Sequence, residues 1–166
     1  MALSQRLVDF ALTLQLPRSE ENDIVHILAD LPTPLRYLNQ TTYDPLRFRP
    51  SPIAIETKTD TPSSSGRSQL AVWTQAWFHR MRLLCPSSSP PPVPLIKVVG
   101  HCWSLLFAWE DEEGNFVLMG EQGFGTTQTL VGTYKIMAGL RVLGEWMEGP
   151  FKAWFDQNVL EYEDTE

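Results

Sequence analysis

The chain opens with an alternation of apolar and polar residues that predicts a β-strand. From Leu7 to Leu16 every second residue, beginning at Val8, is apolar, and Asp9 lies on the other face. A second strand is predicted where an apolar run starting at Pro52 reaches Glu56 and Lys58. Because strand side chains alternate between faces, Glu56 and Lys58 point the same way. A lone Glu-x-Lys is more often a surface ion pair, but it is also the pairing that metal-assisted phosphodiester hydrolysis needs.

A long amphipathic helix is predicted from about Arg67 to Leu84. Its apolar residues recur at helical spacing and form one stripe. The stripe consists of Leu70, Trp73, Trp77, Met81 and Leu84. Gln69 lies one turn before Trp73 on this stripe, where its amide would bond the backbone or reach the strand that carries Glu56.

The second half of the chain is predicted to form strands and then two helices. The predicted elements are a buried strand over 95–109 with a bulge at Gly100, an acidic turn over 110–115, a partner strand over 116–119, a Gly/Thr-rich loop over 120–129, and helices over 129–148 and 150–160. Together with the first half, this order favours an α/β fold with a central mixed sheet flanked by helices.

Three segments look irregular. Residues 17–52 contain six prolines, so we expect either an ordered excursion or a mobile lid, with a short helix or strand from Ile24 to Leu31. Residues 86–94 are rich in Ser and Pro and predict a stiff connector, and residues 161–166 predict an acidic tail. At 166 residues the whole chain, 1–166, is expected to be one domain.

Charge and cysteine content narrow the classes of function. A formal net charge of −7 disfavours tight binding to nucleic acid, which depends on Lys and Arg contacts to phosphates. Cys85 and Cys102 suggest neither a disulfide framework nor a zinc site. No apolar run is long enough to cross a membrane, and Arg6 and Asp9 interrupt any signal-peptide pattern, so we expect an intracellular protein of the cytoplasm or nucleus.

Several motifs in order resemble those of the PD-(D/E)XK nuclease superfamily, whose members share the restriction-endonuclease-like fold, and the run is most similar to its fungal nuclease-like domain proteins. The matching text is Pro52-Ile-Ala-Ile-Glu-Thr-Lys58, Gln69-Leu-Ala-Val-Trp73, Val99-Gly-His-Cys-Trp103, Gly125-Thr126, Gly132-Thr-Tyr134, Trp146 and Trp154. The resemblance implies a central mixed sheet flanked by helices. It also implies that the superfamily's leading helix, which often supplies another acidic residue, is absent or truncated here.

The resemblance implies a metal-dependent catalytic site. Asp9 and Glu56 would be the metal carboxylates, joined by the carbonyl oxygen of Thr57. Lys58 would hold or polarise the attacking water, and Gln69 would orient one of these groups. The implied metal is Mg²⁺ or Mn²⁺, since Mg²⁺ prefers oxygen ligands and keeps several of its waters.

Three functions remain open from the sequence. The first is a magnesium-dependent nuclease, which the acidic charge leads us to expect to be weak or inactive. The second re-uses the fold to act on a small molecule, with a Trp-rich apolar pocket and His101 as an alternative site. The third is a non-catalytic interaction module. No membrane partner is expected, and the oligomeric state stays open.

Overall fold

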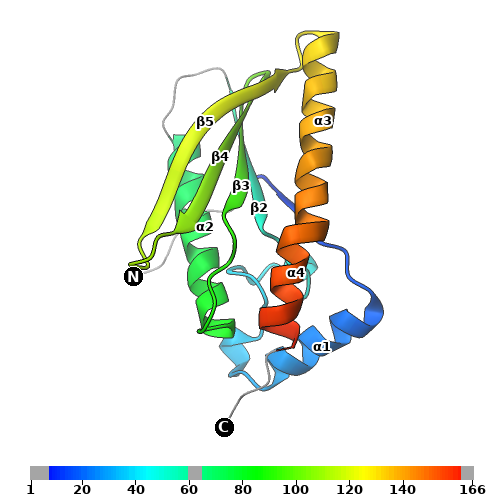
Figure 1. Cartoon of the computed structure of the whole chain (residues 1–166), viewed down its shortest axis with the longest axis vertical. Helices are drawn as coiled ribbons and strands as arrows, with labels where there is room; N and C mark the ends of the chain where they lie inside the picture. The colour runs from blue at the N-terminus through cyan, green and yellow to red at the C-terminus, as the bar shows by residue number, and fades with distance from the viewer. Residues whose placement is uncertain (1–7, 60–64, 162–166) are drawn as a thin grey trace.

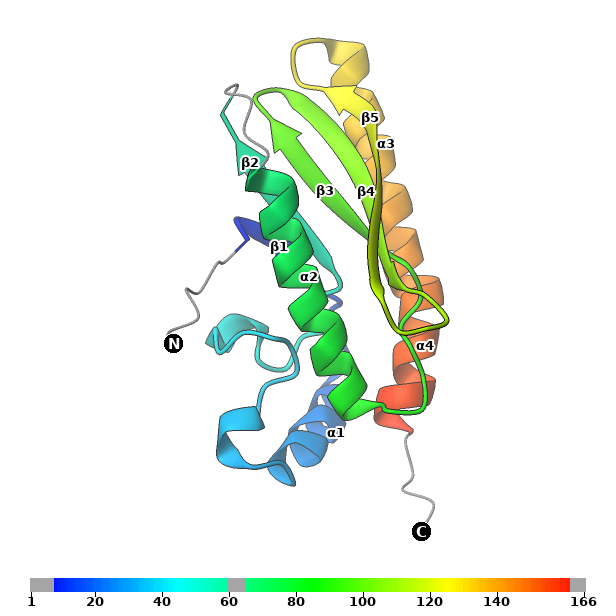
Figure 2. The same ribbon diagram turned by 90° about the vertical axis from the view of Figure 1, so that its left-hand side faces the viewer.

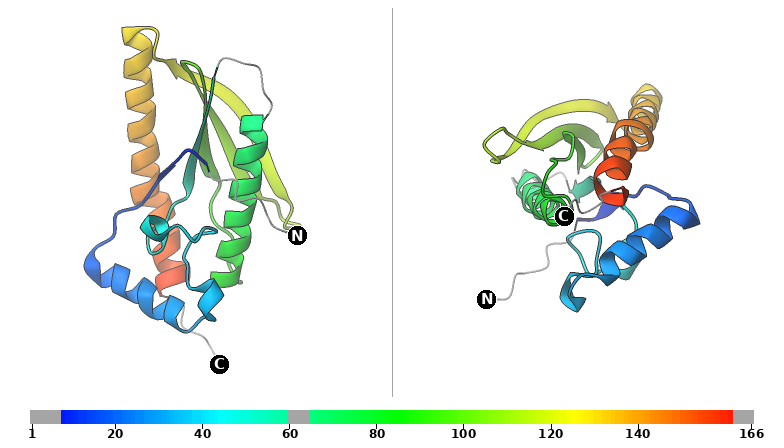
Figure 3. Two further views of the ribbon diagram at one scale, coloured as in Figure 1. Left: turned by 180° about the vertical axis from the view of Figure 1, so that it is seen from behind. Right: turned by 60° about the horizontal axis from the view of Figure 1, so that its bottom comes forward.

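The computed structural model describes residues 8–59 and 65–161, and its centre is a five-stranded mixed sheet with strand order β1-β2-β3-β4-β5. Helix α2 covers one face of this sheet, and α3, continued by α4, covers the other (Figures 1 and 3). The α/β class with flanking helices is therefore confirmed. The strands are β1 Phe10–Leu12, β2 Ile53–Lys58, β3 Val93–Val99, β4 Cys102–Glu110 and β5 Phe116–Thr126. The main helices are α1 Arg18–Ala29, α2 Ser65–Leu84, α3 Leu130–Trp146 and α4 Lys152–Phe155.

Strand β2 lies between an antiparallel neighbour and a parallel one. It pairs with β1 through Phe10 opposite Ile55, and with β3 through Ile55 beside Ile96. Helix α2 makes the crossover between β2 and β3 and lies diagonally across the sheet in Figure 2. The carboxyl ends of the two parallel strands consequently lie at one edge, where Lys58 ends β2.

The first predicted strand is much shorter than its alternation suggested. The ladder of β1 covers Phe10–Leu12, although Leu14 and Leu16 keep their place in the core. Beyond Leu12 the regular register is lost, because the amide of Leu14 donates to the carbonyl of Pro50 at 2.8 Å, whereas the register of β1 and β2 would place Leu14 opposite Ser51. Leu14 and Leu16 are therefore buried as the alternation predicts, although they lie beyond the end of the β1–β2 ladder. The predicted absence of a leading helix concerns residues 1–7, which lie outside the described part of the chain.

The predicted buried strand over 95–109 is wrong, because two strands occupy this segment. Val99 faces Cys102 in the β3–β4 ladder, so Gly100 and His101 form a two-residue hairpin turn. Gly100 has a φ of 55°, which suits the first central position of such a turn. The apolar run is continuous because both strands pass through the core.

The predicted loop over 120–129 is also wrong. β5 continues to Thr126, with a bulge at Gly120 (φ 82°) between the pairs Phe107–Met119 and Leu105–Gln122. Farther along β5 and at the start of α3, two glycines allow the strand and the helix to pack closely. A Cβ on Gly125 would come within 2.4 Å of Ile136 in α3, and a Cβ on Gly132 within 2.3 Å of the Thr126 carbonyl.

Residues 17–52 form an ordered excursion. The predicted helix or strand at 24–31 is helix α1, which is followed by two short 3₁₀ turns, Thr33–Leu35 and Asp44–Leu46. The buried Arg80 of α2 fastens the segment by donating to the carbonyls of Leu35 and Tyr37. Asn39 is also buried and donates to the carbonyls of Leu46 and Arg49.

The two predicted C-terminal helices form one continuous helical rod. α3 passes through a π-helical turn, Met147–Phe151, into α4 and a second π-helical turn, Asp156–Leu160. Pro150 lies inside the first of these turns and does not interrupt the rod. Glu161 follows as an exposed residue, and the remainder of the predicted acidic tail lies outside the described residues.

The predicted connector over 86–94 is mostly exposed until β3 begins at Val93, and Ser88 accepts a hydrogen bond from the Trp154 indole at 3.0 Å.

Cys85, which precedes the connector, is buried, and burial raises the pKa of its thiol to about 11. Cys102 is exposed and also carries a free thiol. Among the described residues, no helix is both long and apolar enough to span a membrane.

Two glycines of β5 give a matched test of this packing. Gly125→Ala is expected to destabilise the fold by about 1–3 kcal/mol, because overfilling a packed contact forces the backbone to shift. Gly123→Ala should be neutral or stabilise by up to about 1 kcal/mol, since nothing lies within 4 Å of the added methyl group. Urea unfolding of both variants measures the difference. Equal effects would show that α3 does not pack closely on β5.

Candidate functional site

The candidate site lies on the α2 face of the sheet, where β1, β2 and β3 run side by side. The register of β1 and β2 places Asp9, the residue before Phe10, opposite Glu56. The register of β2 and β3 places Lys97 directly beside Glu56. Asp9, Glu56 and Lys97 are therefore brought together by strand pairing, although no two of them are close in sequence.

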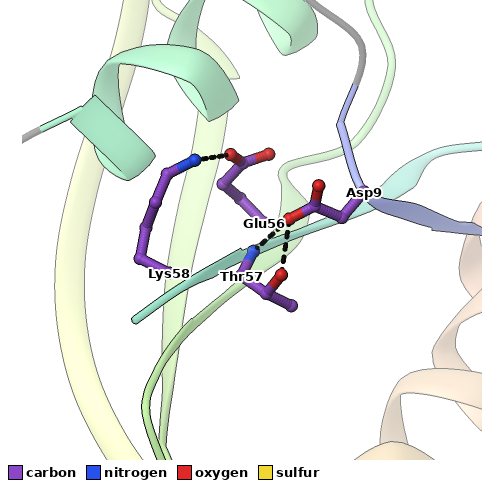
Figure 4. A network of polar contacts seen from close by, with 4 residues as sticks. All are labelled: Asp9, Glu56, Thr57 and Lys58. Carbon is purple, nitrogen blue, oxygen red and sulfur yellow. Dashed lines mark hydrogen bonds and ion pairs between the residues drawn. The ribbon is translucent and has the colours of Figure 1, made fainter. Parts of the chain in front are cut away.

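Glu56 is buried, and its carboxylate is incompletely satisfied. The side chain is 1% exposed, and its Oε1 accepts from Nζ of Lys58 at 2.5 Å (Figure 4). Its Oε2 is buried without a hydrogen-bond partner within the described residues. Burying a charge is costly unless it is paired and hydrogen-bonded, so this oxygen marks a place for a cation or a donor.

Asp9 is tied to the strand that carries Glu56. Its Oδ2 accepts from the backbone amide of Thr57 at 2.8 Å and from the Thr57 hydroxyl at 2.6 Å (Figure 4). The Thr57 hydroxyl, the Thr57 amide and the charge of Lys58 together hold the pKa of Asp9 below its usual range, against a smaller opposing effect of burial. Asp9 is thus an exposed carboxylate that stays ionised at the end of the β1–β2 ladder. Thr57 makes these contacts through its amide and hydroxyl, and the role implied for its carbonyl stays a prediction.

The first turn of α2 lies over the site. A Cβ on Gly66 would lie 3.4 Å from Cγ of Lys58, 3.6 Å from Cδ of Lys97 and 3.7 Å from Cγ of Glu56. The lack of a side chain at Gly66 therefore leaves room beside Glu56. Gln69 is on the same helix and half-buried, but in the described part of the chain no hydrogen bond joins it to Asp9, Glu56 or Lys58.

Lys97 and Glu121 were missed by the sequence analysis. Lys97 is 14% exposed and forms an ion pair with Glu121. The β5 bulge at Gly120 immediately precedes Glu121. Arg67 donates to the carbonyls of Gly120 and Leu118 at 2.8 and 2.9 Å, which holds the start of α2 against β5. The sequence signal for Lys97 was its charge within the otherwise apolar run of β3. Its proximity to Glu56 could not be predicted from this run, because it depends on the pairing of β2 with β3.

His101 lies in a turn of the sheet, and three of the six tryptophans pack together in the core. His101 lies in the β3–β4 turn, half-buried, with its carbonyl accepting from the Thr127 amide at 3.1 Å. The neighbouring Gly100 amide donates to the Lys58 carbonyl at 2.9 Å, so this turn lies at the site's end of the sheet. Trp77, Trp146 and Trp154 pack around Phe151 in the core. These three tryptophans are therefore used in core packing, and the alternative site at His101 stays a prediction.

The contact between Asp9 and Thr57 predicts a measurable titration. Thr57→Val keeps the branched shape but removes the hydroxyl, so the pKa of Asp9 should rise toward about 3.9, its value in an unfolded chain. In the native protein the lowered pKa contributes stability at pH values above the unfolded pKa, and this contribution is lost as the pH falls through the folded pKa. Carboxyl ¹³C NMR titration follows Asp9 directly. An unchanged pKa would mean that Thr57 does not hold this carboxylate.

A scan against protein families matches residues 2–152 to the model described as PD-(D/E)XK nuclease superfamily. Searches of curated proteins and of solved structures found no match. The family match covers most of the chain and agrees with the mixed sheet and its flanking helices. The strand with Glu56-Thr57-Lys58, the antiparallel strand next to Asp9 and the following helix α2 all lie within it. The chain therefore belongs to the PD-(D/E)XK nuclease superfamily.

Proposed function

We propose that this protein is a divalent-metal-dependent phosphodiesterase whose site is formed by Glu56, Asp9 and Lys58. The observation that carries the proposal is the buried Glu56 carboxylate, which has one oxygen on Lys58 and the other unpartnered. A surface ion pair would not need such burial. The closer likeness to fungal members, which rests on the quoted motif run, is part of the same proposal.

The donor set fits a small hard cation. Glu56 Oε2 is unpartnered, and Asp9 uses Oδ2 for both bonds to Thr57, which leaves its Oδ1 to face a ligand. No group of three His, Cys, Asp or Glu side chains that could hold a metal occurs within residues 8–59 and 65–161. Mg²⁺ needs no such cage, because it commonly uses one or two carboxylates and keeps its waters. A bound Mg²⁺ or Mn²⁺ would supply charge neutralisation and a more acidic water.

The lysines supply positive charge on both sides of Glu56. Lys58 extends from the same strand and Lys97 from the parallel neighbour, with 26% and 14% of their side chains exposed. In hydrolysis a water oxygen forms a bond to phosphorus, and the leaving oxygen takes up a proton as its bond to phosphorus breaks. In this proposal Lys58 would hold and polarise the water, and Lys97 would bind a phosphate oxygen. Gln69 retains its implied role of orienting one of these groups.

Activity on long duplex nucleic acid should be low. The arginines that might have attracted a polyanion are used within the fold: Arg67 binds two carbonyls of β5, and Arg47 donates to the Arg36 carbonyl while lying over the ring of Phe48. Arg49 is exposed, but the whole chain carries a net charge of −7. Such a chain repels a polyanion at long range, so a short phosphodiester suits this site better than a duplex.

Glu56→Gln is expected to abolish metal-dependent hydrolysis. It should also weaken Mn²⁺ binding by more than about 100-fold, since even changes in groups that merely orient metal ligands cost roughly 10–100-fold. Isothermal titration with Mn²⁺ and hydrolysis of bis(p-nitrophenyl) phosphate measure the two effects. Glu145→Gln is the matched control, because Glu145 lies on α3 in an exposed pair with Arg141. Undiminished Mn²⁺ binding in Glu56→Gln would overturn the proposed metal centre.

Lys97→Met should separate substrate binding from metal binding. Losing a charged hydrogen bond of about 1.5–3 kcal/mol should raise KM roughly 10-fold or more while Mn²⁺ affinity is kept. Lys135→Met, at an exposed position on α3, is the control for loss of one positive charge. Steady-state kinetics on bis(p-nitrophenyl) phosphate provide the values. A KM equal to that of the control would remove Lys97 from the site.

A further inference from the structure

A cavity of about 350 Å³ lies directly beside Asp9. It is formed between β1, the segment Thr41–Leu46 and the middle of α2. Its lining residues are Val8, Asp9, Phe10, Ala11, Thr41, Tyr43, Leu46 and Trp73. This volume falls in the range of small-ligand sites, and the lining is largely apolar. Asp9 belongs both to this cavity and to the charged site on β2.

Three aromatic side chains from three different elements face this cavity. Phe10 of β1 and Tyr43 are 61% and 58% exposed, whereas Trp73 of α2 is 9% exposed and closes the cavity toward the core. Two exposed aromatic rings beside a buried one form a surface on which a flat ring can stack.

The backbone around Tyr43 is held in place without a ligand. Its amide donates to the Thr41 hydroxyl at 3.2 Å, and its carbonyl accepts from the Leu46 amide at 2.9 Å. Gln40 ties the same segment to α2 by donating to the Trp73 carbonyl at 3.2 Å. The exposed ring is therefore presented from a fixed turn, so binding to it would cost little ordering of the backbone.

We infer that this cavity binds the base of a nucleotide whose phosphodiester lies at Glu56, Lys58 and Lys97. The inference rests on the proposed function, because it assigns the group attached to the phosphate that the charged site would hydrolyse. A nucleobase is flat, stacks on aromatic side chains irrespective of its identity, and is joined to a phosphate. A base in a duplex is already stacked and paired, so the substrate is a single-stranded end or a short nucleotide ester.

Two esters with the same leaving group test this assignment. In Mn²⁺, the p-nitrophenyl ester of thymidine 5′-monophosphate should be hydrolysed with a kcat/KM at least 10-fold above that of methyl p-nitrophenyl phosphate. Tyr43→Ala should remove most of this advantage, measured as the ratio of the kcat/KM values for the two esters. Tyr43→Phe should retain the advantage, because the ring is kept. Tyr134→Ala is the matched control, since Tyr134 is 62% exposed on α3.

A binding measurement keeps the inference separate from catalysis. Saturation-transfer NMR with thymidine 5′-monophosphate should show the strongest saturation on the base protons, and Tyr43→Ala should reduce it at least 5-fold. Binding without hydrolysis of either ester would overturn the proposed phosphodiesterase and leave the base pocket standing. Hydrolysis of both esters with equal kcat/KM, or base protons without saturation, would overturn the pocket.

Discussion

A carboxylate buried in the middle of a sheet has to be neutralised, and this requirement organises the region around Glu56. Its neighbours on β2 and β3 are lysines, and its own side chain is 1% exposed. Removing an ion from water costs several kcal/mol, which an ion pair offsets only if its geometry is excellent and further hydrogen bonds satisfy the remaining lone pairs. Among the described residues, Oε1 of Glu56 has such a pair and Oε2 has no hydrogen-bond partner, so the compensation of this charge there is incomplete.

The surrounding charges are balanced locally in spite of the acidic chain. Glu56 pairs with Lys58, and Lys97 with Glu121. Arg67 also approaches Glu121, at 3.8 Å, while donating to the backbone of β5. Near the site the protein therefore presents paired charges instead of a positive surface. Under the proposed function, a metal ion and a phosphate would replace these internal partners, which would favour a compact ligand.

Patterns within a single segment correctly predicted which residues share a face of a strand or a helix. Alternation placed Glu56 and Lys58 on one face, and helical spacing placed Trp73 and Trp77 on the buried stripe of α2. Pairing between strands is not local, so the position of Lys97 beside Glu56 could not be read from its own segment. A glycine in an apolar run permits either a bulge or a turn, and Gly100 proved to be a turn because the flanking segments pair with each other.

For the candidate site, too, features within one segment were predicted, and contacts between distant segments were not. Asp9 was chosen because of an alternating pattern that predicted a strand longer than β1. Its carboxylate still reaches Thr57, because the β1–β2 ladder ends next to Asp9. The base pocket was not predicted, since Tyr43 lies in an irregular segment whose position is set by distant contacts to α2. Sequence reasoning was thus strongest for the acidic and basic pair and weakest for the groups that would recognise a substrate.

The contact between Asp9 and Thr57 has a consequence for how relatives of this chain should be compared. The Asp9 carboxylate takes the place of a backbone acceptor for the Thr57 amide and so ends the outer edge of the sheet. Selection for folding would preserve this aspartate in a lineage that had lost all catalysis, because a bare amide at a sheet edge invites pairing with another chain. Retention of Asp9 in a relative is therefore a weak indication of activity, whereas Oε2 of Glu56, which has no hydrogen-bond partner among the described residues, is the more informative group to compare.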